Sequence, residues 1–297
     1  MKKWAIVTDS CSDLSKDFRD KYNIDYVKML INWTDEKGVS HEEIADLDWK
    51  TLSSKEFYDI IRRGIRIRTS QATMFNYLDI FEKHLENGED VLYLACSSGL
   101  SASLNTAILL SENELREKYP NNRVIVLDSL RAGMSLGMIV MKAQELKDEG
   151  KSIDEVADYI NKVKLTYKEI GIPETLTYLR RAGRVSAGAA FMGNMISLKP
   201  ILVFNDLGIN EAKEKAVGRK KAYARMAEMI KEDIVDPENQ TIYLMHADAE
   251  EKDVQGFINA IKAKVTVKEI ITQPLGPIIG ASSGPGTLIC NYIGKHD

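Results

Sequence analysis

The sequence is poor in cysteine, and its cysteines are widely spaced. Its 297 residues include Cys11, Cys96 and Cys290, none of which belongs to a C-x-x-C pair. This spacing implies neither a zinc site nor a disulfide framework, so we expect no metal site. Three buried free thiols in a reducing compartment are the favoured interpretation.

The chain also lacks an excess of basic residues and any long hydrophobic run. It has 40 Lys and Arg against 44 Asp and Glu, a formal net charge of -4, which does not favour nucleic acid as a partner. No run approaches the roughly 18 apolar residues needed to span a membrane. The apolar stretch Trp4 to Val7 ends at Thr8-Asp9-Ser10, too early for a secretory signal. We therefore expect a cytoplasmic protein.

Short apolar runs alternate with helical patterns in the first half of the chain. The runs Trp4 to Thr8, Val91 to Ala95 and Val124 to Leu127 are each followed by a helical pattern. Continuous apolar strands that alternate with helices favour a parallel sheet covered on both faces. We predict an N-terminal α/β domain over residues 1–165.

The second half has a different pattern. Apolar runs at Pro200 to Phe204, Ile242 to Met245 and Val265 to Ile271 are interleaved with helices, and Asp206-Leu207-Gly208 is typical of a hairpin turn. A length prior of roughly 150 residues per domain also favours two domains. We predict a C-terminal mixed α/β domain over residues 166–297. Two domains meet in a cleft, which is a common position for a ligand.

Two clusters of hydroxyl residues precede helical patterns. One, Ser97-Ser98-Gly99-Leu100-Ser101, follows the strand Val91 to Ala95, and the other is Thr69-Ser70-Gln71-Ala72-Thr73. Hydroxyls and unpaired backbone N–H groups at the start of a helix bind anions. Neither cluster contains a positive charge, so an anionic ligand needs a further source of affinity. The alternative is that Ser101 and Thr69 only cap helices.

Short motifs spread along the whole chain form a recognisable series. They are the opening Ile6-Val7-Thr8-Asp9-Ser10-Cys11-Ser12-Asp13-Leu14, Thr69-Ser70-Gln71, Ser97-Ser98-Gly99-Leu100-Ser101, Val126-Leu127-Asp128-Ser129, Thr175-Leu176-Thr177-Tyr178-Leu179, Gly183-Arg184-Val185-Ser186, Lys199-Pro200-Ile201-Leu202, Gly218-Arg219-Lys220-Lys221-Ala222 and Gly284-Pro285-Gly286. In this order they resemble the DegV family of bacterial lipid-binding proteins.

The resemblance implies a non-catalytic carrier of two α/β domains with a ligand tunnel between them, which needs no cofactor other than its ligand. It implies a bound long-chain fatty acid, about C16 to C18, whose methylenes each contribute about 0.8 kcal/mol when buried. In the family, a partner fatty-acid kinase phosphorylates the carboxylate of the bound acid. The acyl phosphate then enters phospholipid synthesis.

The resemblance also assigns roles to residues. The carboxylate contacts of the family fall on Thr69 and Ser101, and the two clusters extend the predicted carboxylate site to Ser70, Ser97 and Ser98. Ser282 stands where many members have a histidine that helps to bind the head group, so it completes the predicted carboxylate site, with a neutral hydroxyl in place of a titratable imidazole. A basic segment of the family matches at Arg184 and Arg219, which we expect to contact the kinase or, transiently, a membrane surface.

Two enzymatic alternatives would use the same cleft. A lipid hydrolase would use Ser101 as its nucleophile, but Gly99-Leu100-Ser101-Ala102-Ser103 lacks the second glycine of the G-x-S-x-G motif. A phosphotransfer enzyme would need a phosphate-binding loop. Gly284-Pro285-Gly286 is too short for one, and no G-x-x-x-x-G-K-[ST] sequence occurs.

Overall fold

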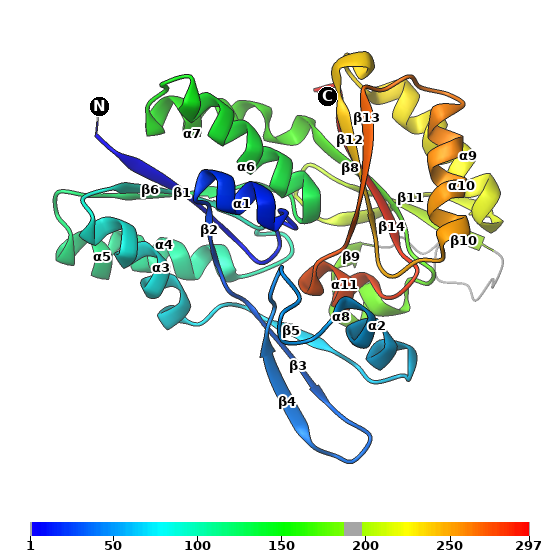
Figure 1. The fold of residues 1–297 in the computed structure, drawn as a ribbon, viewed down its shortest axis with the longest axis horizontal. Coiled ribbons are helices and arrows are strands. Elements are labelled where there is room, and N and C mark those ends of the chain that lie inside the picture. The colour runs from blue at the N-terminus through cyan, green and yellow to red at the C-terminus, as the bar shows by residue number, and fades with distance from the viewer. Residues whose placement is uncertain (1, 187–197, 297) are drawn as a thin grey trace.

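The computed structural model describes residues 2–186 and 198–296, which form a mixed α/β fold (Figure 1). A four-stranded parallel sheet has the order β2-β1-β6-β7. Its strands are β1 (Trp4–Asp9), β2 (Asp25–Val27), β6 (Asp90–Ala95) and β7 (Val124–Asp128). The parallel sheet predicted for the first half of the chain is therefore confirmed.

Helices cover both faces of the parallel sheet. Those that contact it or connect its strands are α1 (Lys16–Tyr22), α3 (Met74–Glu86), α4 (Ser103–Glu112), α5 (Glu114–Lys118), α6 (Gly133–Asp148) and α7 (Ile153–Val163). Figure 1 shows α3 and α4 on one face and α6 and α7 on the other, and contacts with β1, β6 and β7 agree. Strands buried on both faces explain why β1 and β6 read as continuous apolar runs.

A seven-stranded mixed sheet has the order β13-β12-β14-β8-β10-β11-β9. Its strands are β8 (Tyr167–Ile172), β9 (Val185–Ser186), β10 (Leu198–Phe204), β11 (Asn210–Val217), β12 (Thr241–His246), β13 (Glu269–Pro274) and β14 (Leu288–Ile293). The remaining helices of this half are α8 (Thr177–Ala182), α9 (Gly218–Asp233), α10 (Glu251–Lys262) and α11 (Pro277–Ser283). The predicted hairpin turn joins β10 to β11, which pair antiparallel.

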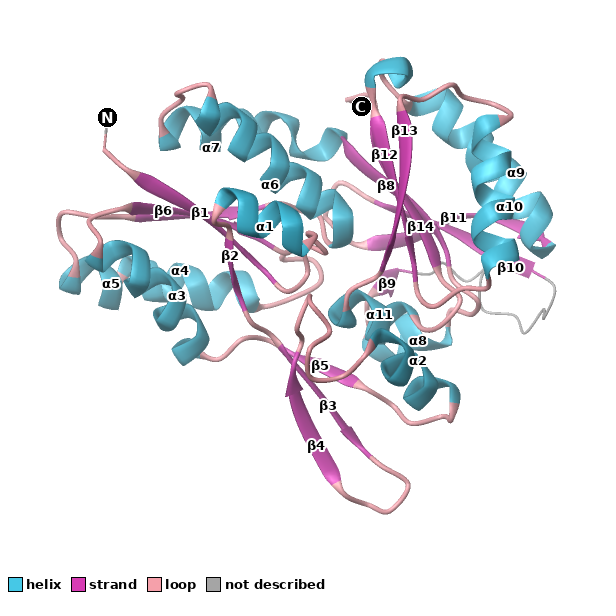
Figure 2. Ribbon diagram, viewed as in Figure 1, coloured by secondary structure: helices cyan, strands magenta, loops and turns pink. Residues whose placement is uncertain are grey.

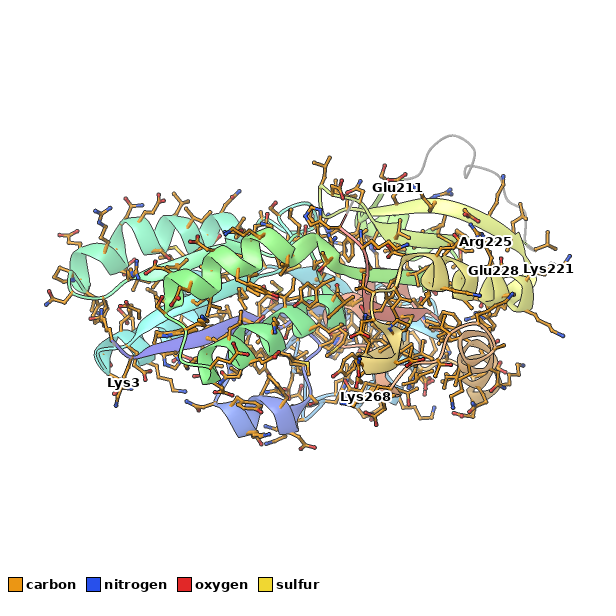
Figure 3. The ribbon with its side chains drawn as sticks, turned by 90° about the horizontal axis from the view of Figure 1, so that it is seen from above. Lys3, Glu211, Lys221, Arg225, Glu228 and Lys268 are labelled. Atoms are coloured by element: carbon orange, nitrogen blue, oxygen red, sulfur yellow. The ribbon has the colours of Figure 1, made fainter. Side chains whose placement is uncertain are left out.

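Helix α6 lies between the two large sheets. It contacts β1 and β6 on one side and β8 and β14 on the other, and most of its residues are buried. A helix that packs on two sides has to be apolar around most of its circumference. The side-chain view in Figure 3 shows the length of the molecule, with Lys3 near one end and Lys221 near the other.

A small antiparallel sheet, which the sequence pattern did not reveal, projects from the body of the molecule (Figure 2). Its order is β4-β3-β5, with β3 (Leu30–Thr34), β4 (Ser40–Ile44) and β5 (Arg68–Ser70), and α2 (Ser54–Arg62) follows β4. The side chains of β4 are exposed or half-buried. A strand without a buried face leaves no apolar alternation in the sequence.

Two predicted elements differ in the structure. The helical pattern that follows the run Val91 to Ala95 forms two helices, α4 and α5, which are divided at Asn113. The strand expected over Val265 to Ile271 starts only at Glu269, because Val265 instead packs beside helix α10 in the core of this half. The boundary at residue 165 falls within a short 3₁₀ helix, Lys164–Thr166, and the division into two domains stays a prediction.

Candidate functional site

A cavity of about 260 Å³ lies between the two large sheets. The carboxyl ends of β1 and β6 contribute Cys11 and Cys96 to its wall, and β5, β8, β10, β14 and α11 supply most of the rest. Together with these two cysteines, the following apolar residues make up most of the described lining: Met29, Leu100, Ala102, Ala132, Ile172, Pro173, Leu179, Leu202, Phe204, Ile278, Ile279 and Ile289. The carboxyl edge of a parallel sheet is the usual ligand position in open α/β folds.

Four of the predicted carboxylate ligands, Thr69, Ser70, Ser101 and Ser282, line this cavity. They come from three separate parts of the chain, so the fold brings together hydroxyls that are distant in sequence. Ser283, which the sequence reasoning missed, also lines the cavity. Its hydroxyl is buried and has no hydrogen-bond partner among the described residues. A buried hydroxyl in this position is a donor available to a ligand.

Capping explains the two hydroxyl clusters only in part. Thr69 lies in strand β5, and the residue that caps α3 is Thr73, whose hydroxyl accepts a hydrogen bond from the Asn76 amide at 3.3 Å. The capping interpretation is therefore wrong for Thr69. The Ser101 hydroxyl accepts a hydrogen bond from the Ser103 amide at 3.2 Å, in the turn that leads into α4. The N-cap of α4 is Ala102, so Ser101 is not the N-cap, but its hydroxyl pairs with the first amide of the helix and the residue also lines the cavity.

Ser97 and Ser98 have different positions. Neither is among the described residues that line the cavity. The buried Ser97 hydroxyl donates to the carbonyl of Gly208 at 2.8 Å and accepts from the amide of Gly99 at 3.1 Å. Ser98 is exposed, and its amide donates to Asp128. The Ser97 side chain thus has a structural role. Its hydrogen bond joins the loop Ser97 to Ser101 to the turn between β10 and β11.

The buried carboxylate of Asp9 fixes the start of the loop Ser97 to Ser101. Asp9, at the end of β1, accepts hydrogen bonds from the amides of Cys11 at 2.9 Å and Cys96 at 2.8 Å and from the Tyr93 hydroxyl at 3.1 Å. Burial raises the pKa of Asp9, although these hydrogen bonds oppose the shift. Asp9 therefore holds two neighbouring strand ends in one arrangement at the cavity wall.

The three cysteines are free and buried, as the sequence predicted. Cys11 and Cys96 line the cavity. A hydrogen bond with Cys96, together with burial, raises the pKa of the Cys11 thiol, so these thiols are protonated and contribute apolar surface. Among the described residues, no group of three or more His, Cys, Asp or Glu side chains is placed to hold a metal ion.

A second, more polar cavity of about 200 Å³ adjoins the first. The two share Thr69, Arg184 and Ser282. Besides Arg184, the second cavity is lined by Arg66, Arg68 and Arg181, and no Asp or Glu occurs among its described lining residues. We call this second cavity the arginine groove. Its charge favours an anion next to the hydroxyl end of the apolar cavity.

Arg184 and Arg219, the two predicted contact residues, lie in different surroundings. Arg184 lines both cavities. Arg219, at the start of α9, forms an ion pair with Glu174 and lies 3.4 Å from Asp253, and its Nε donates to the Tyr223 hydroxyl at 2.6 Å. Acidic neighbours already neutralise Arg219, so an anionic partner would have to displace them.

The sequence reasoning also missed two buried carboxyl groups beside the cavity. Glu169 lines the cavity from β8, and burial raises its pKa to about 8, although Arg131 opposes the shift. Asp13 follows β1, and burial raises its pKa to about 8 as well. The only sequence signal for Glu169 is its position directly before the apolar run Ile170-Gly171-Ile172.

The geometry does not favour the hydrolase alternative. The side-chain partner of the Ser101 hydroxyl is the Ser103 hydroxyl at 2.8 Å. Within residues 2–186 and 198–296, no histidine lines either cavity. A serine nucleophile needs a base within hydrogen-bond reach.

None of the described helices is both long and apolar enough to cross a membrane.

The chain was compared with known proteins. The profile of the family described as "Uncharacterised protein, DegV family" matches residues 3–293. A DegV domain-containing protein of Clostridium perfringens is 35% identical over 294 residues, 99% of this chain and 98% of the relative. A crystal structure described as a DegV lipid-binding protein, from Thermotoga maritima, has a TM-score of 0.83 at 28% identity and 98% coverage of both chains.

A second solved structure, described as the fatty-acid binding of a DegV family protein from Thermus thermophilus, has a TM-score of 0.82. It is 27% identical and covers 99% of this chain and 100% of its own. The motif series, the fold and the match from residue 3 to residue 293 agree. This chain belongs to the DegV family.

Proposed function

We propose that the protein binds a long-chain fatty acid in the apolar cavity and presents its carboxylate to a partner kinase. The observation that carries this proposal is the arrangement of the two cavities. An apolar cavity has uncharged hydroxyls at Thr69 and Ser282, where it meets the arginine groove. Two solved relatives described as lipid-binding and fatty-acid binding support the ligand class.

The hydrocarbon chain supplies most of the affinity. An acid of about C16 to C18 buries about fifteen methylenes at roughly 0.8 kcal/mol each, or about 12 kcal/mol before the cost of ordering the chain. A neutral hydrogen bond contributes only about 1 kcal/mol. The hydroxyls therefore orient the carboxylate, whereas the apolar wall retains the ligand.

The polar end suits a carboxylate that has to react. Two or three hydroxyl or amide donors keep a buried carboxylate ionised. Thr69, Ser101, Ser282 and the unpaired Ser283 offer such donors. A bidentate arginine would occupy both carboxylate oxygens. Hydroxyls leave one oxygen free to attack the phosphoryl group that the kinase supplies.

The arginine groove has the charge needed beside this reaction. Arg184 lines the groove and the apolar cavity, so this residue lies near the place where an acyl phosphate would form. Arg66, Arg68 and Arg181 add positive charge without a neighbouring carboxylate in the described lining. In this proposal the protein is a cytoplasmic carrier, the kinase does the chemistry, and the product enters phospholipid synthesis.

The contact surface follows from the same arrangement. The kinase, and transiently the membrane surface, would approach over the arginine groove and Arg184. Arg219 takes part in this proposal only if a partner's acidic groups displace Glu174, because that carboxylate forms an ion pair with it. The two predicted domains, 1–165 and 166–297, would provide the opposing walls from which the ligand is loaded and released.

The proposal is tested in two steps with delipidated protein. First, palmitic or stearic acid should displace a fluorescent fatty acid, and failure of both acids to bind would reject the ligand. Second, Arg184→Ala should lower the rate of acyl-phosphate formation by a purified bacterial fatty-acid kinase about tenfold or more and change fatty-acid affinity little. Lys3→Ala, which removes an exposed basic side chain near one end of the molecule (Figure 3), is the matched control. Equal rates for the two variants would reject the role of Arg184.

A further inference from the structure

The apolar cavity contains a polar group, Glu169, that is not part of the proposed carboxylate site. Glu169 lines the cavity from strand β8 and is 9% exposed. Its carboxyl group accepts no hydrogen bond from any residue in the described part of the chain. The nearby Arg131 instead donates its hydrogen bonds to the backbone carbonyls of Tyr167, Leu130 and Leu165.

Further buried oxygens without partners lie beside Glu169. One carboxyl oxygen of Asp13 has no hydrogen-bond partner within the described ranges, and neither has the side-chain oxygen of Asn291. Asn291 is the cross-strand neighbour of Glu169 in β14, and directly opposed residues project to the same side of a sheet. The orphaned Asp13 oxygen and a Glu169 oxygen both lie within 4.0 Å of the point where a Cβ on Gly133 would be.

Unsatisfied buried oxygens in a native protein need an explanation, because each costs free energy. Of these groups Glu169 lines the cavity, and a saturated hydrocarbon there would leave its carboxyl group without a hydrogen-bond partner. A hydroxyl group on the acyl chain would donate to one oxygen and accept from a protonated carboxyl group. A second carboxylate on the ligand would instead add a negative charge beside two acidic groups.

We propose that Glu169 forms a second polar subsite inside the acyl cavity, which hydrogen-bonds to a hydroxyl group on the acyl chain and so selects hydroxylated long-chain acids. This inference rests on the proposed function, because it concerns the same cavity. In this proposal Glu169 contacts the middle or the end of the acyl chain, whereas Thr69, Ser101 and Ser282 contact the carboxylate. Burial, which raises the pKa of Glu169 to about 8, keeps this carboxyl group protonated at neutral pH, so it both donates and accepts.

The test uses delipidated protein and positional isomers of hydroxystearic acid, each compared with stearic acid by displacement of a fluorescent fatty acid. At least one isomer should bind about tenfold more tightly than stearic acid, as one satisfied buried hydrogen bond predicts. The position of the hydroxyl group in the preferred isomer shows which carbon of the acyl chain lies beside Glu169. A wild-type protein that binds stearic acid as tightly as every isomer contradicts the subsite.

Three variants complete the test. Glu169→Leu should remove the preference for the hydroxylated isomer and preserve stearic acid binding, whereas Glu169→Gln should keep part of the preference. Glu211→Gln, in half-buried strand β11 near the outer edge of the molecule (Figure 3), is the control. A preference that survives in Glu169→Leu contradicts the subsite. If neither stearic acid nor any isomer binds, the proposed function itself fails, which is a separate outcome.

Discussion

Asp13 accepts a hydrogen bond from the backbone amide of Gly276 at 3.2 Å, although 263 positions separate the two residues in the chain. Asp13 follows β1 of the parallel sheet, and Gly276 precedes α11, whose residues line the cavity. This bond therefore ties the carboxyl edge of the first sheet to the helix that carries Ser282 and Ser283. The other oxygen of the same carboxyl group is buried without a partner among the described residues.

Stability should depend on pH through Asp13. Burial raises its pKa from 3.8 to about 8, so between these values the native state holds a proton that the unfolded state has lost. The free energy of unfolding then falls as pH rises, by up to about 1.4 kcal/mol per pH unit. Asp13→Asn keeps the acceptor for Gly276 and should flatten this decline, measured by urea unfolding from pH 5 to pH 8.

Glu169 contributes a decline of the same sign, because burial raises its pKa to about 8 as well. This second decline should remain in Asp13→Asn. Asp158→Asn, which removes an exposed carboxylate of α7, controls for the change in net charge. An unfolding free energy that falls as steeply in Asp13→Asn as in the wild type would show that Asp13 is ionised in the native protein.

Ser97→Ala should affect stability and leave ligand binding unchanged. The substitution removes the donor to the buried Gly208 carbonyl, which should lower the free energy of unfolding by about 1–3 kcal/mol. Thermal unfolding and fatty-acid displacement measure the two effects. The exposed neighbour gives the control, since Ser98→Ala should change neither quantity. A loss of affinity in Ser97→Ala without a loss of stability would support the direct ligand contact predicted from the sequence.

Removing the Thr69 and Ser101 hydroxyls together should separate retention of the ligand from its presentation. Each hydroxyl contributes about 1 kcal/mol, against about 12 kcal/mol from the buried chain. Thr69→Ala combined with Ser101→Ala should therefore slow acyl-phosphate formation by the kinase much more than it weakens fatty-acid binding. Thr73→Ala removes the cap of α3 and should lower stability alone. Equal losses of binding and phosphorylation in the double variant would mean that the hydroxyls dominate affinity.

The sequence predicted the parts of the structure that depend on local pattern. Strands β1, β6 and β7 were recognisable because both of their faces are buried or partly buried. The hairpin between β10 and β11 was recognisable from its turn residues. Strand β4 left no signal, because none of its side chains is fully buried.

The candidate site was predictable in composition but not in geometry. The motifs marked Thr69, Ser101 and Ser282, which line one cavity. They did not distinguish Ser97, whose hydroxyl bonds to Gly208 from a distant turn. Glu169 and Arg68 were missed because their significance depends on neighbours far away in the chain. Long-range packing decides which polar side chain faces a cavity and which is satisfied by the backbone.

Native mass spectrometry of gently purified protein tests the central proposal most directly. The cavity should retain its ligand, so a population of the folded protein should carry one adduct with the mass of a long-chain fatty acid, about C16 to C18, bound mainly by its buried methylenes. Release of this mass on denaturation would identify the acid. A folded protein that has its bare polypeptide mass in every preparation, and that takes up no fatty acid when one is added, would contradict the proposal.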